Sequence, residues 1–398
     1  MRSILILMHT ESNTGFAINT LEAVFFRMAL ELCEQDASRI HFAYPSMQKG
    51  PTEGLPGDFR RYLILDSRAA DRAECEKAAR YISDHGIDLV FGCDQPVHRP
   101  IYKYLRRAGV RHFISYWGAP MSSLSGKIRL GLKRLEVVLR TNGPDHYIFE
   151  SNGMAQRAIL GRGIPARRTS VVHTGIDLNR YSPRPEDADY VYRALAIPGD
   201  EPIFFYSGHM EKRKGVQIIM QAANLLSATR PDLSWHVVLC GNRPGEEVSL
   251  ARMLGPAAAK RVLFAGYRND LPLLQRGCYA GVIASTGWDS FPMSAIEMQA
   301  SGLPVIVSDL PGISETIAEG ESGLAVPAGD AQALCEAMIR LLVEPALRER
   351  LSQGARDRAE RLFSRDRQRA NLVSVVNSVV GGRRIRDAML RHGIRDQN

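Results

Sequence analysis

The sequence predicts an α/β protein built from two doubly wound, parallel-sheet domains that face a central cleft, and three observations support this. The chain has 398 residues, which exceeds what one hydrophobic core usually supports. Short apolar runs alternate with helical segments in both halves, as they do where helices connect parallel strands. A polar stretch with two prolines, 179–187, separates the halves. Ligands of open α/β sheets bind beyond the carboxyl ends of the strands, so we expect the functional site in the cleft.

The first domain is expected over residues 1–185. Its strands are predicted from short apolar runs, and its helices from longer segments with apolar residues three or four positions apart. The expected strands are 4–8, 40–44, 89–91, 112–115 and 147–149. The expected helices are 18–33, 73–84 and 128–140.

The second domain, expected over residues 186–365, repeats this plan. Its expected strands are 203–206, 235–239, 262–265, 281–284 and 305–307. Its expected helices are 216–228, 271–276 and 293–301. The last part of the chain, 366–398, is expected to contain a helix over 367–380 that crosses back to the first domain, followed by a basic tail.

Composition is that of an ordinary soluble globular protein, with 45% hydrophobic and 24% charged residues. No apolar run approaches the roughly 20 residues that a membrane-spanning helix needs. The apolar start, 1–8, is too short for a signal peptide, and the six cysteines have no paired spacing, so we expect a cytoplasmic protein. The net charge of +8 favours anionic partners, such as sugar nucleotides or a phospholipid surface. No basic motif with interleaved aromatic residues indicates nucleic acid.

Two carboxylates stand eight positions apart, Asp289 in a loop rich in Gly, Ser and Pro, and Glu297 within a short predicted helix. At about 100° per residue, Glu297 lies beside the apolar face that carries Ile296. An ionised carboxylate in this position is costly unless it is hydrogen-bonded, and the diol of a ribose or another sugar is a suitable partner. The alternative is a helix-edge glutamate that pairs with an arginine.

A basic loop, 207–215, follows the strand predicted at 203–206 and precedes a helix. Four of its residues can be cationic: His209, Lys212, Arg213 and Lys214. Cations beside a helix N-terminus suit a pyrophosphate, although a solvated basic turn would have the same composition. Two later strands end in Gly241 and in Gly266-Tyr267, where the main chain could admit a base or ribose. Ordinary turns explain these glycines equally well.

The order and spacing of these motifs resemble retaining glycosyltransferases of the GT-B fold, in the glycosyl transferases group 1 family (glycosyltransferase family 4-like), whose two domains are Rossmann-like. The family's paired-glutamate motif and its following Gly-Xaa-Pro-Val-Ile pattern match 289–306. Its phosphate loop matches 208–215, with Lys214 at the lysine position. Its Asn-Gly-Val-Asp turn matches 174–177, and its glycine-rich loop after the first strand matches 13–16.

Four positions depart from the family pattern. Asp289 stands where the first glutamate is usual, and Thr174 replaces the asparagine of the turn. His209 replaces a phosphate-binding arginine, which Arg213 could supply from the same loop. Tyr116-Trp117 replaces a histidine often found in the first domain. None of these changes removes the pyrophosphate site, so we expect an active enzyme.

The resemblance implies a hexosyltransferase-type enzyme (EC 2.4) that retains the anomeric configuration. It would move a sugar from a UDP- or GDP-sugar to a hydroxyl on a sugar, lipid-linked or small-molecule acceptor, in polysaccharide, glycolipid or other glycoconjugate biosynthesis. No cofactor or metal is expected, because no Asp-Xaa-Asp motif occurs in a suitable loop and the basic loop supplies positive charge. The residues expected to act in catalysis are Lys214, Arg213 and Asp289. Those expected at the donor are Gly15, Phe16, His209, Tyr267, Phe291, Pro292, Met293, Ser294 and Glu297.

The acceptor is expected on the first domain, near His9, Tyr116 and Trp117. The two aromatic rings could stack on the apolar face of a sugar, or Trp117 could belong to the core. The segment 125–140 forms a basic amphipathic helix that could rest on the inner face of an anionic membrane. Helices of this kind more often pack on the surface of the protein itself.

Three other classes of protein compete with this interpretation. A sugar-nucleotide epimerase of the GT-B fold would share the architecture, but its motifs are absent. A dinucleotide-dependent oxidoreductase would have Gly-Xaa-Gly-Xaa-Xaa-Gly after the first strand, whereas residues 10–16 contain a single glycine. A non-catalytic carbohydrate-binding scaffold stays open as an alternative, because Asp289 and His209 depart from the pattern.

Overall fold

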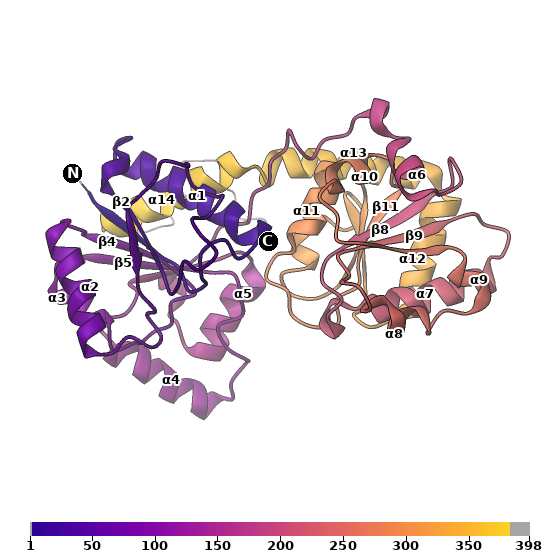
Figure 1. Ribbon diagram of the computed structural model, residues 1–398. Coiled ribbons are helices and arrows are strands. Elements are labelled where there is room, and N and C mark those ends of the chain that lie inside the picture. Colours follow the sequence, from indigo (N-terminus) through magenta and orange to yellow (C-terminus); the bar gives the residue numbers. More distant parts are fainter. Residues whose placement is uncertain (1, 383–398) are drawn as a thin grey trace. The chain divides into compact units, whose positions relative to one another are not determined.

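The computed structural model describes residues 2–382, which form two compact units (Figure 1). The first unit contains residues 2–173 and 365–382, and the second contains Thr174–Ser364. The first unit thus ends before the expected boundary at residue 185, since the proline-containing stretch 179–187 belongs to the second unit. The basic tail expected near the C-terminus lies, from residue 383 onward, outside the described residues.

The first unit is built on a parallel seven-stranded sheet with the order β3-β2-β1-β4-β5-β6-β7. The strands are β1 (Ile4–Leu7), β2 (Ile40–Tyr44), β3 (Tyr62–Ile64), β4 (Leu89–Cys93), β5 (His112–Trp117), β6 (His146–Phe149) and β7 (Thr169–Val171). The helices are α1 (Phe16–Leu32), α2 (Arg72–Asp84), α3 (Tyr102–Arg107), α4 (Lys127–Leu139), α5 (Asn152–Arg157) and α14 (Arg365–Val380). Alternate residues of β1 enter opposite cores: Ile4 and Ile6 pack with α1 and α14, whereas Leu5 and Leu7 pack with α2 and α3.

The second unit is built on a parallel six-stranded sheet with the order β10-β9-β8-β11-β12-β13. The strands are β8 (Ile203–Ser207), β9 (His236–Cys240), β10 (Val262–Gly266), β11 (Ala280–Ile283), β12 (Val305–Ser308) and β13 (Gly323–Val326). The helices are α6 (Tyr190–Leu195), α7 (Val216–Thr229), α8 (Glu247–Ala251), α9 (Pro256–Ala259), α10 (Leu271–Arg276), α11 (Met293–Ala300), α12 (Ala331–Val343) and α13 (Pro345–Leu362). Helices α7 and α12 cover one face of this sheet, and α6, α10 and α11 contribute to the core on the other.

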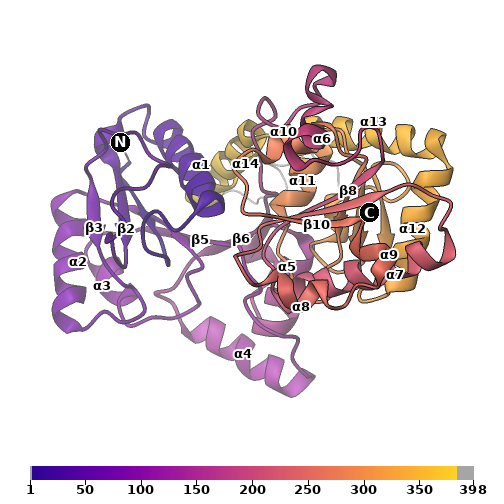
Figure 2. The ribbon, with the colours of Figure 1, turned by 45° about the vertical axis from the view of Figure 1, so that its right-hand side comes forward.

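The predicted fold class is confirmed, because both units are doubly wound parallel sheets. In each sheet the strand order reverses beside the first strand of the unit, between β1 and β4 and between β8 and β11. Open α/β sheets bind their ligands at such reversal points. Helix α14 packs against α1 in the first unit, and the two helices lie side by side in both views (Figures 1 and 2). Within residues 2–382, no helix is both long and apolar enough to cross a lipid bilayer.

Gly215, which precedes α7, has a positive φ of 72° and lies against the loop that follows β11. A Cβ at this position would stand 1.7 Å from the carbonyl oxygen of Ala284. We expect Gly215→Ala to lower the free energy of unfolding by more than about 2 kcal/mol, since a positive φ alone costs an alanine about 1–2 kcal/mol. Gly245→Ala is the matched control: its φ is 91° but a Cβ there would meet no atom within 4 Å. Urea denaturation should show the larger loss for Gly215→Ala, and equal losses would contradict the close approach.

Candidate active site

Two loops meet at the strand reversal of the second unit. Strands β8 and β11 pair in register, so their carboxyl ends are adjacent and the loops 208–215 and 284–292 follow side by side. The backbone N–H groups of Thr286 and Gly287 donate to the carbonyl oxygen of Arg213 at 2.8 and 3.2 Å. The basic loop and the loop that carries the first carboxylate are therefore tied together by their main chains.

Lys214 and Asp289, predicted separately from two motifs, form an ion pair with Nζ and Oδ2 2.5 Å apart. Their side chains are only 18% and 13% exposed. Charges that are this far removed from water interact more strongly than an exposed pair does. The pair therefore fixes the position of a cation and an anion at the carboxyl end of the sheet.

The Arg213 side chain makes two contacts with the loop after β11 and one within its own loop. Its Nη1 donates to the carbonyl oxygen of Trp288 at 2.9 Å, and its Nε pairs with the Oε2 of Glu211 at 2.8 Å. The guanidinium also lies 4.4 Å from the centroid of the Trp288 ring. Such stacking of arginine on an aromatic face is favourable. The sequence interpretation missed Trp288 and Glu211, although a tryptophan in a loop of small residues was a visible signal.

His209 and Tyr267 are both at the surface of the second unit. The carbonyl oxygen of His209 accepts a hydrogen bond from the Tyr206 hydroxyl at 2.7 Å, while its side chain is exposed. Tyr267 is 76% exposed and borders a hollow of about 610 Å³, which Arg268 and Arg276 also line. The contacts expected between these two residues and a donor stay predictions.

Helix α11 begins at Met293, with Pro292 as its N-cap residue and without a side-chain cap. The first N–H groups of a helix carry partial positive charge and suit an anion or a hydroxyl oxygen. Glu297 lies one turn further along α11. It is 5% exposed, and its neighbours Ile296 and Met298 are fully buried. Phe291 is also buried, with its ring centroid 5.4 Å from that of Phe363, so only its main chain is suited to a donor contact.

In the first unit, the loop after β1 ends at Gly15, whose main chain has free space beside it. Gly15 has a φ of 141°, and a Cβ on it would meet no atom within 4 Å. Phe16 begins α1 and is 42% exposed. The space at Gly15 is compatible with the close approach that the sequence predicted, which itself stays a prediction.

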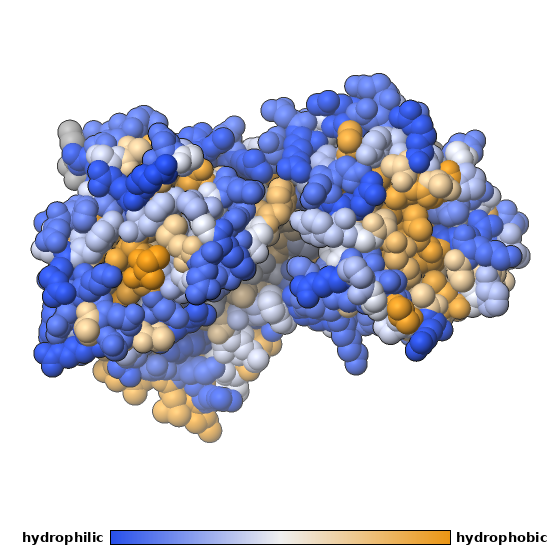
Figure 3. Space-filling view, viewed as in Figure 1, coloured by the Kyte–Doolittle hydropathy of each residue, from blue (hydrophilic) through white to orange (hydrophobic). Residues whose placement is uncertain are grey.

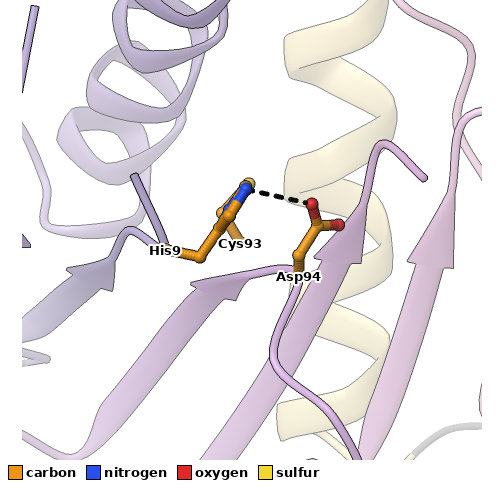
Figure 4. A group of neighbouring side chains, drawn as sticks. All are labelled: His9, Cys93 and Asp94. Carbon is orange, nitrogen blue, oxygen red and sulfur yellow. Dashed lines mark ion pairs between the residues drawn. The ribbon is translucent and has the colours of Figure 1, made fainter. Parts of the chain in front are cut away.

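His9 and Asp94 meet at the strand reversal of the first unit, beyond β1 and β4 (Figure 4). His9 Nε2 lies 3.4 Å from Asp94 Oδ2. Asp94 adopts a positive φ of 50°, its N–H donates to the carbonyl oxygen of Tyr116 at 2.7 Å, and its Oδ1 accepts from the Gly118 N–H at 3.0 Å. Burial raises the pKa of Asp94, although the neighbouring His9 and the hydrogen bond from Gly118 oppose this rise. The sequence interpretation named His9 but missed Asp94.

Cys93 brings a third metal-ligating atom to this pair, and all three atoms lie within 4.8 Å of one another. Burial raises the pKa of the Cys93 thiol well above its usual value. Only the thiolate is a good metal ligand, so a metal ion would first have to displace this proton.

The expectation that Tyr116 and Trp117 stack on an acceptor sugar disagrees with their burial. Tyr116 is completely buried in the core beside α1, and its hydroxyl donates to Glu150 Oε1 at 3.0 Å. Trp117 is 9% exposed and packs in a separate apolar cluster with Phe149. Both lie on β5, whose two faces are covered, so their rings stabilise the unit rather than lining its surface.

The family described as glycosyl transferases group 1 matches residues 191–358. A D-inositol 3-phosphate glycosyltransferase of Corynebacterium glutamicum (strain R) is 31% identical over 234 residues, which are 57% of this chain and 55% of the relative. The chain thus spans about half the length of the curated relatives it matches.

Two solved structures resemble the fold along nearly the whole chain. A glycosyltransferase from Rickettsia africae ESF-5 has a TM-score of 0.76 at 14% identity and covers 95% of this chain and 99% of its own. HepE of Anabaena, in complex with UDP, has a TM-score of 0.75 at 18% identity; the match covers 94% of this chain and 100% of HepE. Residues 191–358 thus match the glycosyl transferases group 1 family, and the chain has the GT-B fold of these solved structures.

Proposed function

We propose that this protein is a retaining, metal-independent glycosyltransferase (EC 2.4) that transfers a sugar from a UDP- or GDP-sugar to a hydroxyl acceptor. The observation that supports this most is the Lys214–Asp289 pair, which stands at the carboxyl end of a parallel sheet and within the family match. HepE, which has the same fold, is known in complex with UDP and with UDP-glucose. The donor class proposed for this chain agrees with those ligands.

The proposed donor site uses charges that the structure already positions. Lys214 would neutralise the diphosphate, and Asp289 would accept a hydrogen bond from a hydroxyl of the donor sugar. Because these two side chains hold each other in place, little reorganisation is needed when a phosphate and a hydroxyl take over their contacts. The first N–H groups of α11 would face the diphosphate or the sugar hydroxyls, and Glu297 would accept both ribose hydroxyls.

Transfer breaks the bond between C1 of the donor sugar and the diphosphate oxygen, and it forms a bond between C1 and the acceptor oxygen. The acceptor's proton passes to the leaving phosphate on the same face of the sugar, so the configuration at C1 is retained. Negative charge develops on the leaving oxygen, where a fixed cation lowers the barrier. A double displacement would need a carboxylate nucleophile, and Glu297 is assigned to the ribose instead. We place such a reaction in polysaccharide, glycolipid or other glycoconjugate biosynthesis in the cytoplasm.

A thermal-shift panel of UDP-, GDP-, ADP- and dTDP-sugars tests the donor assignment, since a ligand that binds the folded state raises its melting temperature. We expect a UDP- or GDP-sugar to raise it, and transfer of a labelled sugar from that donor to acceptor mixtures to follow. Binding without any turnover would indicate the carbohydrate-binding scaffold instead. If none of the sugar nucleotides binds, the proposed function is wrong.

Removal of divalent metal should leave this reaction intact. We expect EDTA to change neither the thermal shift produced by the donor nor the rate of sugar transfer, because Lys214 and the start of α11 supply the positive charge. The same assay on Asp94→Asn, which removes a carboxylate from the cluster of His9, Cys93 and Asp94, should be equally insensitive to EDTA. Activity that disappears with EDTA and returns with Mg²⁺ or Mn²⁺ would contradict metal independence.

A further inference from the structure

Helix α4 exposes an apolar stripe that the proposed active site does not use. Four large side chains, Ile128, Leu132, Leu135 and Leu139, are 86%, 65%, 56% and 68% exposed. Their spacing of four, three and four residues places them within an arc of about 60° on the helix surface. An apolar patch is visible at the edge of the first unit where α4 lies (Figure 3).

The opposite side of α4 is anchored to the first unit. Val137 is the one fully buried residue of the helix and stands about 180° from the stripe. On this side, Lys133 Nζ donates to the carbonyl oxygen of Gly161 at 2.6 Å. On the flank of the helix, Glu136 pairs with Arg162 at 3.0 Å. Because these contacts hold the inner side, the apolar stripe faces away from the unit and is not a helix face that the fold has left loosely packed.

Four cations flank the stripe on both sides: Lys127, Arg129, Arg134 and Arg140. By helical geometry, Lys127 and Arg134 lie about 100–130° to one side of it, and Arg129 and Arg140 about 90–110° to the other. All four are exposed, and within residues 2–382 no carboxylate forms an ion pair with any of them. Long basic side chains in these positions can reach past an inserted apolar face to anionic headgroups.

We propose that α4 docks on the surface of an anionic phospholipid bilayer, with the stripe in the headgroup–acyl boundary and the flanking cations on lipid phosphates. The charge pattern favours this occupant over a second copy of the chain, because self-association through α4 would bring the cations of two helices together. It also explains why large apolar side chains remain in water on a helix whose inner face is firmly attached. This docking surface is independent of the proposed sugar transfer.

Co-sedimentation with vesicles tests the proposal. The wild-type protein should bind vesicles of phosphatidylcholine mixed with phosphatidylglycerol, and bind vesicles of phosphatidylcholine alone much more weakly. The double variant Leu132→Glu, Leu135→Glu should bind the mixed vesicles at least about tenfold more weakly, because it removes most of the apolar insertion. Val343→Glu changes a side chain of similar exposure (45%) on α12 and should bind as wild type does.

A second variant separates charge from apolar insertion. The double variant Arg129→Ser, Arg134→Ser should weaken binding by about fivefold for each cation removed and should reduce its sensitivity to salt. Lys260→Ser with Arg350→Ser removes two exposed cations of the second unit and should leave binding unchanged. Circular dichroism melting verifies that all variants fold.

Two outcomes would overturn the proposal. One is binding of the mixed vesicles by the stripe variant with wild-type affinity. The other is a dimer in light scattering that Leu132→Glu, Leu135→Glu dissociates, since the stripe would then be an interface between copies. Loss of vesicle binding by the stripe and charge variants, with both controls unaffected, supports docking even if no sugar nucleotide proves to be a donor.

Discussion

Lys214→Ala should lower the turnover of sugar transfer by about 10²–10³-fold while it weakens donor binding much less. Lys214 is the proposed cation at the leaving diphosphate, where negative charge grows as the C1–O bond breaks. An interaction that strengthens in the transition state affects kcat more than ground-state affinity. Steady-state kinetics with a labelled donor, together with calorimetric affinity for the free nucleotide, measures both quantities.

Two further variants show whether the effect belongs to this one cation. Lys212→Ala removes an exposed lysine from the same loop and should change turnover by less than about twofold, as surface changes usually do. Lys214→Arg keeps the charge beside Asp289 and should recover part of the lost rate. If Lys214→Ala reduces affinity and turnover equally, Lys214 contributes only to ground-state binding, and the catalytic role assigned to it is wrong.

Glu297→Ala should weaken nucleotide binding by roughly 1.5–3 kcal/mol for each ribose hydrogen bond lost. The carboxylate is buried on the second turn of α11, where its oxygens are suited to a diol. Isothermal titration with UDP or GDP gives the affinity, and the deoxyribose nucleotide gives a direct comparison. The variant should bind ribose and 2′-deoxyribose nucleotides almost equally, whereas the wild type should prefer the ribose form.

Glu336→Ala is the matched control for this change, because Glu336 is an exposed glutamate on α12 whose side chain accepts a hydrogen bond from Gln332. It should leave nucleotide affinity unchanged. Melting temperatures distinguish lost binding from lost stability, since Glu297 is buried and its replacement could disturb α11. Unchanged affinity in a folded Glu297→Ala protein would refute the ribose contact.

Much of the fold could be predicted because buried parallel strands are short continuous apolar runs. The run 305–307 and the observed β12 agree for this reason, as do 203–206 and β8. The missed strands β3 and β7 have three residues each and are only partly buried, so they have no such run. The last strand, β13, contains a glycine and an alanine that lower its apolar signal.

The candidate site could be predicted in part, because its residues lie in loops that follow predicted strands and its motifs keep the family's spacing. Lys214 and Asp289 lie 75 positions apart, yet each follows a predicted strand, and the sheet order brings them together. The sheet order itself is not visible in the sequence. The pairing of His9 with Asp94 depends on β1 lying beside β4, and the burial of Tyr116 depends on α1 and α14 covering β5.

The first unit is discontinuous in sequence, since α14 completes it after the whole second unit. Leu372 and Val376 of α14 are fully buried in the same core as α1 and β1. On the ribosome, residues 174–364 can therefore fold as one uninterrupted segment, whereas the core of the N-terminal sheet is completed only after α14 has been synthesised. Nascent chains of intermediate length thus expose an apolar surface that a chaperone would recognise, and a recombinant fragment that ends at residue 173 would share this liability.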